Sequence, residues 1–190
     1  MKLKTILLSS LLYFSLALAI AQAKQVTIQN LLAVELADWD GDASRDRAVL
    51  ARPENPDEEG AVLYIYLSNN EHGKLIEKKN IAWVGLMWGT IPTLSINKSG
   101  SLLVHSMNES IGRNRWSQTL TLSYRNNRFI VSGYSYSSRD ALKIDKGVFV
   151  CDVNLLTGKG VVNGKPFRIA KQKRSLKDWN DDFIPKQCMD

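Results

Sequence analysis

The sequence predicts an all-β protein, a small antiparallel meander that is propeller-like or closed as a sandwich or barrel. Short runs of β-branched, aromatic and other apolar residues recur along the 190-residue chain, and segments rich in Gly, Pro, Asn and Ser separate them. This spacing indicates about eight to ten short strands. A complete propeller does not fit, because blades of roughly 40–50 residues would number at most about four.

The first residues have the features of an export signal. Two lysines lie near the start, an apolar run covers residues 6–20, and a small-x-small motif ends at Ala23. This pattern predicts a cleaved signal peptide over residues 1–23, followed by one domain over residues 24–190. A membrane anchor is the alternative, but the apolar run is short for a span and ends in a cleavage motif. We therefore expect a periplasmic or secreted protein without a membrane span.

The composition bounds the partners and cross-links of the exported domain. The formal net charge is +6, or about +4 once the two signal lysines are removed, which is too small to indicate nucleic-acid binding. Cys151 and Cys188 are the only cysteines, and an even count in an exported chain predicts one disulfide. Closing this loop would stabilise the fold by roughly 3–4 kcal/mol in the chain-entropy description.

The first predicted strands flank an acidic loop. Residues 26–36 are rich in apolar side chains and predict a strand or a short helix, with a strand favoured at the end of the segment. Residues 48–50 predict a buried strand, residues 52–60 a turn that contains proline, and residues 61–67 another strand. The acidic loop therefore connects two neighbouring strands.

The acidic loop is the one place where residue type and spacing together indicate a specific chemistry. Asp38, Asp40, Asp42 and Asp46 occupy positions 1, 3, 5 and 9 of the loop, and the Ser44 carbonyl lies at position 7. Alternate positions of a tight turn can point inward together, and Ca²⁺ takes about six to eight oxygen ligands. Without a cation, four carboxylates this close would repel one another. We predict that these five residues bind Ca²⁺; an Asp-rich, solvated turn without a metal is the alternative.

The surroundings of the loop exclude one calcium motif and resemble another. The helix–loop–helix hand needs Gly at position 6 and Glu at position 12, where this chain has Ala43 and Val49. The order Asp-x-Asp-Gly-Asp-x-x-x-Asp, strand, proline-containing turn and Gly-Ala-Val-Leu-Tyr-Ile-Tyr instead resembles one FG-GAP/VCBS-type repeat, over about residues 33–68. That repeat carries the calcium loops of integrin-like β-propellers and of many secreted bacterial proteins. The resemblance implies that the four aspartates ligate Ca²⁺ through their side chains and Ser44 through its backbone. Two residues depart from the repeat, because Ala43 replaces its usual Gly and Arg47 an apolar residue.

Two hairpins are predicted in the second half of the chain. Residues 93–97 and 101–107 flank a short turn that contains glycine. Residues 116–124 alternate strictly and precede a strand over residues 129–136, with Asn126-Asn127 as a two-residue turn between them.

The register of the second hairpin separates a core face from a polar face. The pairs expected on the core face are Tyr124–Phe129, Leu122–Val131 and Leu120–Gly133. Hydroxyls and tyrosines on the opposite face, together with arginines at the turn, make it a candidate binding face for a protein or a glycan. The residues of this candidate face are Thr119, Thr121, Tyr134, Tyr136, Arg125 and Arg128. An ordinary solvated sheet face is the alternative interpretation.

Three further features complete the chain. Residues 85–89 predict an aromatic loop, where Trp83 and Trp88 near paired glycines could form a ligand platform. We interpret these tryptophans as core, which is their more common place. Residues 147–153 predict a strand that carries the first cysteine, and Asn163-Gly164 predicts a hairpin turn.

The sequence does not indicate an enzyme. Of the two histidines, His72 and His105, the second alternates with apolar residues within a predicted strand, and we interpret it as a satisfied sheet residue. Nucleophile-elbow, zinc-ligand and phosphate-loop motifs are absent from the sequence. We therefore predict a non-catalytic, exported, calcium-stabilised module that binds a protein or a glycan. The alternatives are a small exported hydrolase with an unrecognised site, and an inhibitor or immunity-type protein that acts on an extracellular enzyme.

Overall fold

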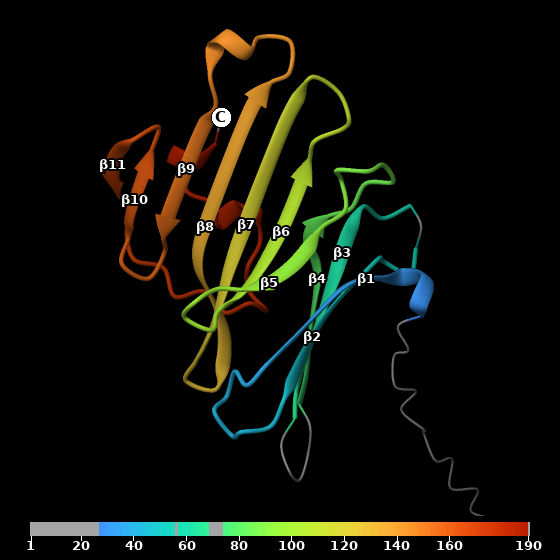
Figure 1. The fold of residues 1–190 in the computed structure, drawn as a ribbon. Helices are drawn as coiled ribbons and strands as arrows, with labels where there is room; N and C mark the ends of the chain where they lie inside the picture. Colours follow the sequence, from blue (N-terminus) through green and yellow to red (C-terminus); the bar gives the residue numbers. More distant parts are fainter. Residues whose placement is uncertain (1–26, 56, 69–73, 190) are drawn as a thin grey trace, which may run out of the picture.

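The computed structural model describes residues 27–55, 57–68 and 74–189 (Figure 1). The predicted signal peptide and His72 lie outside these residues. In the described part of the chain, no helix is long and apolar enough to span a membrane.

The described residues form eleven strands in two antiparallel sheets, which confirms the predicted all-β class. The four-stranded sheet contains β1 (Leu31–Ala37), β2 (Asp46–Ala51), β3 (Gly60–Leu67) and β4 (Lys74–Trp83). The seven-stranded sheet contains β5 (Thr93–Ile96), β6 (Leu102–Asn108), β7 (Asn114–Arg125), β8 (Arg128–Asp140), β9 (Phe149–Asn154), β10 (Lys159–Val162) and β11 (Lys165–Arg168). Each sheet is a meander, because every strand pairs with the next one along the chain.

Four short 3-10 segments accompany the strands in the described residues. They are η1 (Ile28–Asn30), η2 (Ile144–Lys146), η3 (Asp181–Phe183) and η4 (Lys186–Cys188). The ambiguous N-terminal segment is therefore a 3-10 turn followed by a strand. The strand count exceeds the predicted range by one, and β7 and β8 are longer than predicted.

The two sheets share one hydrophobic core. The four-stranded sheet contributes Leu50, Leu63 and Ile65, and the larger sheet contributes Leu122 and Val131 among others, all fully buried. The smaller sheet lies against the β5–β7 end of the larger one, where β1 contacts β5 and β4 contacts β6 (Figure 1). In the described residues the sheets do not close into a barrel.

The C-terminal segment, residues 169–189, adds to the core beside β8 and β9. The Val131 amide donates to the Arg174 carbonyl at 3.0 Å, and the Leu176 amide donates to the Phe129 carbonyl at 2.9 Å. These bonds fix the segment along β8, and the side chains of Leu176 and Trp179 are buried in the core.

Two covalent or charged contacts hold this segment in place. The predicted disulfide between Cys151 and Cys188 is present, with the two Cα atoms 5.2 Å apart, and it joins β9 to η4. The Lys78 ammonium of β4 donates to the Lys177 carbonyl at 3.2 Å and also to the Trp179 carbonyl. Burial lowers the pKa of Lys78. A disulfide of this kind indicates an oxidising compartment, where such bonds persist.

The β7–β8 hairpin has the predicted turn but only part of the predicted register. Both turn residues have positive φ, as a type I′ turn requires, and Leu122 pairs with Val131 as expected. The expected pairing of Leu120 with Gly133 is wrong: Leu120 pairs with Tyr134. A β-bulge is the cause, because Ser132 is an extra residue on β8 and every later side chain changes face.

Candidate functional site

The loop between β1 and β2 gathers three carboxylates. Asp38, Asp40 and Asp42 each offer an oxygen, and these oxygens lie within 4.8 Å of one another. The group is at the surface, with Asp40 half-buried. An all-oxygen ligand set of this kind suits a hard cation such as Ca²⁺.

Hydrogen bonds from the loop backbone orient these side chains. Asp38 accepts from the amides of Gly41 at 2.7 Å and Ala43 at 3.0 Å, and Asp42 accepts from the Ser44 amide at 2.7 Å. Each carboxylate oxygen has about two acceptor positions, so these bonds leave capacity for a cation. Burial, and then the charges of the nearby aspartates, raise the pKa of Asp40. Repulsion among the carboxylates disfavours their ionised form. A bound cation would remove this electrostatic cost.

Asp46 is not part of this group, although the sequence predicted it as a ligand. Its side chain is 0 % exposed and accepts from the amides of Trp39 and Ser68, each at 2.8 Å. The carboxylate thus closes the loop onto the end of β3. Ser44, whose carbonyl oxygen is the predicted backbone ligand, donates its N–H to Asp42 within the loop.

The loop backbone contains one unfavourable residue. Gly41 has φ +81° and Ala43 has φ +66°. A residue with a Cβ pays about 1–2 kcal/mol in this left-handed region, whereas glycine does not. Ala43 therefore stands at a position for which glycine is the better residue.

The acidic loop also contacts the larger sheet. The Trp39 ring packs edge-on against Phe129 with centroids 5.8 Å apart, and Phe129 in turn contacts Tyr124 at 5.1 Å. Burial raises the pKa of Tyr124, and the charges of Asp40 and Asp46 raise it further. The carboxylates therefore lie beside the turn end of the β7–β8 hairpin, and the loop connects the two sheets.

The candidate binding face predicted on this hairpin is divided between the two sides of the sheet. Tyr134 is buried, and its ring stacks on that of Tyr136 with centroids 6.5 Å apart, on the side that faces the core. Thr119 contacts His105 on the other side of the sheet, and Thr121 lines a polar hollow of about 300 Å³ there. The bulge in β8 turns the two tyrosine rings to the core side, away from the threonine side chains, although Thr121, Arg125 and Tyr134 all line that hollow. The two arginines of the predicted face, Arg125 and Arg128, are exposed at the hairpin turn.

The mouth between the sheets contains a cleft of about 440 Å³, which we call the inter-sheet cleft. The lining residues come from the start of β3 and the residue before it, from β4, β7 and β8, and from the C-terminal segment: Glu59, Gly60, Asn80, Ile81, Ala82, Trp83, Trp116, Gln118, Tyr136 and Asp181. The rings of Trp83 and Trp116 contact each other within this lining, with centroids 5.7 Å apart. The sequence signalled Trp83, but not its partners, which lie far along the chain.

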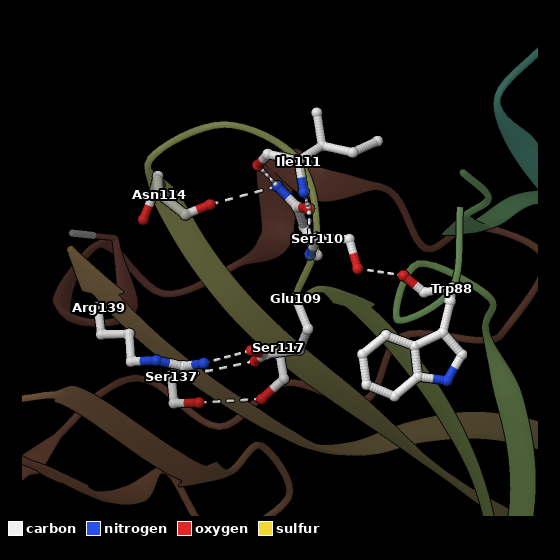
Figure 2. A network of polar contacts seen from close by, with 9 residues as sticks. Trp88, Glu109, Ser110, Ile111, Asn114, Ser117, Ser137 and Arg139 are labelled. Carbon is white, nitrogen blue, oxygen red and sulfur yellow. Dashed lines mark hydrogen bonds and ion pairs between the residues drawn. The ribbon is translucent and has the colours of Figure 1, made fainter. Parts of the chain in front are cut away.

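A second feature lies between β4 and β5, where residues 85–90 form what we call the Trp88 loop. Leu86 and Trp88 are 90 % and 88 % exposed, so the interpretation of Trp88 as core is wrong. The Gly85 amide donates to the Thr90 carbonyl at 3.0 Å, which closes the loop. Figure 2 shows the Ser110 hydroxyl donating to the Trp88 carbonyl, while the Trp88 ring points away from these polar contacts.

The loop between β6 and β7, which supports the Trp88 loop, is itself well bonded. Arg139 of β8 forms an ion pair with Glu109, and the hydroxyls of Ser117 and Ser137 lie 2.9 Å apart (Figure 2). The Glu109 amide donates to the Gly89 carbonyl at 2.9 Å. The Trp88 loop is therefore a fixed apolar projection.

His105 lies within β6, as the sequence predicted. Its Nε2 is 2.7 Å from the Ser95 hydroxyl and its Nδ1 is 2.9 Å from the Thr119 hydroxyl. Burial lowers the pKa of the imidazole.

Comparisons with protein-family models, with curated proteins and with solved structures found no match to this chain.

Proposed function

We propose that this chain is an exported binding module in which Asp38, Asp40 and Asp42 hold a structural Ca²⁺ ion. The single observation that carries the proposal is the convergence of three carboxylates within 4.8 Å on a loop whose backbone amides already orient them. Backbone carbonyls and water would supply the remaining oxygen ligands. Asp46 acts in this proposal as a support for the loop.

The position of the loop explains what such an ion would do. The loop joins β1 to β2 and reaches the larger sheet through Trp39 and Phe129. Neutralising the carboxylates would stabilise this connection between the sheets. The ion would therefore act on folding stability, as a structural ion does, and not on a substrate.

The test compares unfolding in Ca²⁺ with unfolding in EDTA. For wild type, Ca²⁺ at about a hundredfold above Kd should add about 2.7 kcal/mol to the free energy of unfolding. The Asp40→Asn/Asp42→Asn variant should lose this gain. In EDTA it should be at least as stable as wild type, because repulsion between the carboxylates is removed. Asp145→Asn, which changes an exposed aspartate far along the chain, is the matched control. Equal stability of wild type in Ca²⁺ and in EDTA would disprove the ion site.

The export part of the proposal rests on the disulfide together with the predicted signal peptide. Fractionation of cells that express the full chain should recover a shortened protein beginning near Lys24 outside the cytoplasm. A full-length protein in the cytoplasm would contradict it.

A second candidate function is inhibition of an extracellular enzyme, and the Trp88 loop favours it. A projecting apolar loop that is already ordered loses little conformational entropy on binding, and tryptophan is a frequent hot-spot residue. Wild type should then capture a protein from the exported fraction and reduce its activity, and Trp88→Ala should do neither. The predicted hydrolase alternative would instead give turnover without a macromolecular partner.

A further inference from the structure

We propose that the inter-sheet cleft is a binding site for a neutral carbohydrate. This inference names the ligand class of the proposed binding module, but it does not depend on the Ca²⁺ ion. It rests on the shape, composition and backbone of the cleft.

The floor of the cleft is aromatic and polar. Trp116 and Gln118 of β7 lie on the core-facing side of the larger sheet, and Gln118 pairs with Tyr136 across the strands. Farther along the same side, Leu120 and Leu122 are fully buried. The floor of the cleft is therefore the end of the core-facing side of the larger sheet, where the smaller sheet and the C-terminal segment no longer cover it.

Two layers form the walls. The edge strand β4 supplies Trp83 on one side, and the C-terminal segment supplies Asp181 on the other. The Trp83 indole donates to the Glu59 carboxylate at 2.9 Å, which fixes the ring relative to that carboxylate. The Trp83 and Trp116 rings are tilted by 52°. A ligand between the walls would meet the indole rings and the carboxylates together.

The backbone of β4 is irregular where it lines the cleft. Leu63 pairs with Lys78 and Ala61 pairs with Ala82, so three residues of β4 lie opposite one residue of β3. Within this bulge Asn80 has φ +54°. A Cβ on Gly60 would lie 2.2 Å from the Asn80 side-chain oxygen, so only glycine permits this approach. Bulges and strained residues of this kind are over-represented beside functional sites, where they redirect a side chain.

The lining suits a sugar better than a cation. One face of a pyranose is made of C–H groups, which pack on aromatic rings, while its hydroxyls both donate and accept hydrogen bonds. The amides of Asn80 and Gln118 can do both, and the carboxylates of Glu59 and Asp181 can accept. A volume of about 440 Å³ lies within the range of about 300–1,000 Å³ for small-molecule sites. A quaternary ammonium ligand would use the rings and the carboxylates but has no N–H or O–H to donate to the amide oxygens.

The experiment measures binding of cellopentaose, xylopentaose, maltopentaose and chitopentaose to the mature protein by titration calorimetry, in EDTA and in Ca²⁺. At least one saccharide should bind, and Trp116→Ala should weaken it about tenfold or more, the loss expected for one stacked ring. Gln118→Leu, which keeps the side-chain size, should also weaken it. Leu142→Ala removes an exposed apolar side chain outside the cleft and should leave the affinity unchanged.

Each outcome decides the inference. Absence of binding by every saccharide overturns it, as does binding that survives both cleft variants while they remain folded by near-UV circular dichroism. Choline or a lysine peptide binding in place of the saccharides, with loss in Glu59→Gln and at high salt, would identify a cation site instead. Saccharide binding that persists in Asp40→Asn/Asp42→Asn would show that the cleft binds its ligand without the calcium site.

Discussion

Replacing Asp46 by asparagine tests whether this residue is a calcium ligand or a part of the fold. The carboxylate is fully buried and accepts two backbone N–H groups at 2.8 Å each. An asparagine offers one oxygen to one of these donors and presents its own NH₂ group to the other. Asp46→Asn therefore keeps the shape of the side chain and removes one acceptor.

The expected cost follows from these two bonds. A buried N–H group without an acceptor costs about 1–3 kcal/mol, and the retained bond loses the contribution of the charge. We expect Asp46→Asn to lower the free energy of unfolding by about 2–4 kcal/mol. For a urea dependence of about 2 kcal/mol per molar, a middle value for small proteins, the unfolding midpoint should fall by about 1–2 M.

The measurement is urea unfolding followed by tryptophan fluorescence, in EDTA and again in Ca²⁺. Because the two bonds are present without an ion, the loss should be similar in both buffers. Asp42→Asn is the control, since it changes an exposed carboxylate of the same loop and should cost little in EDTA. A loss for Asp46→Asn below about 0.5 kcal/mol in EDTA, or one that appears only in Ca²⁺, would refute the structural role.

Three other predictions concern the cross-link, the loop backbone and the imidazole. Cys151→Ala/Cys188→Ala opens a 37-residue separation and should cost about 4 kcal/mol, measured by urea unfolding; a cost under about 1 kcal/mol would contradict it. Ala43→Gly should raise the melting temperature, because relief of the left-handed strain exceeds the entropy cost of glycine in the unfolded chain. The expected net gain in the free energy of unfolding is up to about 1 kcal/mol, and a lower melting temperature would count against it. Burial lowers the pKa of His105 below 6.5, its value in the unfolded chain. The stability that neutral His105 provides is therefore complete above about pH 6.5 and is lost as the pH falls through the folded-state pKa. His105→Gln should flatten this part of the stability profile, and an unchanged slope would argue against it.

The sequence predicted the parts of this fold that depend on local signals. Paired asparagines in the β7–β8 connection adopt the positive φ values that such a turn needs, and the two cysteines form the predicted disulfide. Alternation of apolar and polar residues placed Leu122 and Val131 in the core. These signals depend on a few neighbouring residues or on the number of cysteines.

The parts that the sequence did not predict depend on single insertions or distant partners. The extra residue Ser132 carries no signal of its own, yet it turns Tyr134 from the predicted outer face into the core. The carboxylate of Asp46 has the right type and spacing for a ligand, but one of its partners, Ser68, lies 22 residues away. Residue type alone does not show which acceptors the backbone already occupies.

The inter-sheet cleft could not be predicted for a related reason. Its residues come from five separate segments, and the rings of Trp83 and Trp116 come into contact only when β4 packs beside the larger sheet. The exposure of Trp88 depends likewise on hydrogen bonds to the following loop. A tryptophan in a sequence is most often core, and only tertiary contacts identify the exceptions.

The β7–β8 hairpin places the two proposed sites far apart. The acidic loop contacts the turn end of the hairpin near Tyr124, and the cleft uses Trp116, eight residues along β7. At about 3.3 Å per residue this separation is about 26 Å, whereas a charge is screened over about 8–10 Å at ordinary ionic strength. The charge of an ion at Asp40 would therefore have little direct effect on a ligand in the cleft. Ca²⁺ should change how much protein is folded, while the folded molecule binds its ligand equally well with or without the ion.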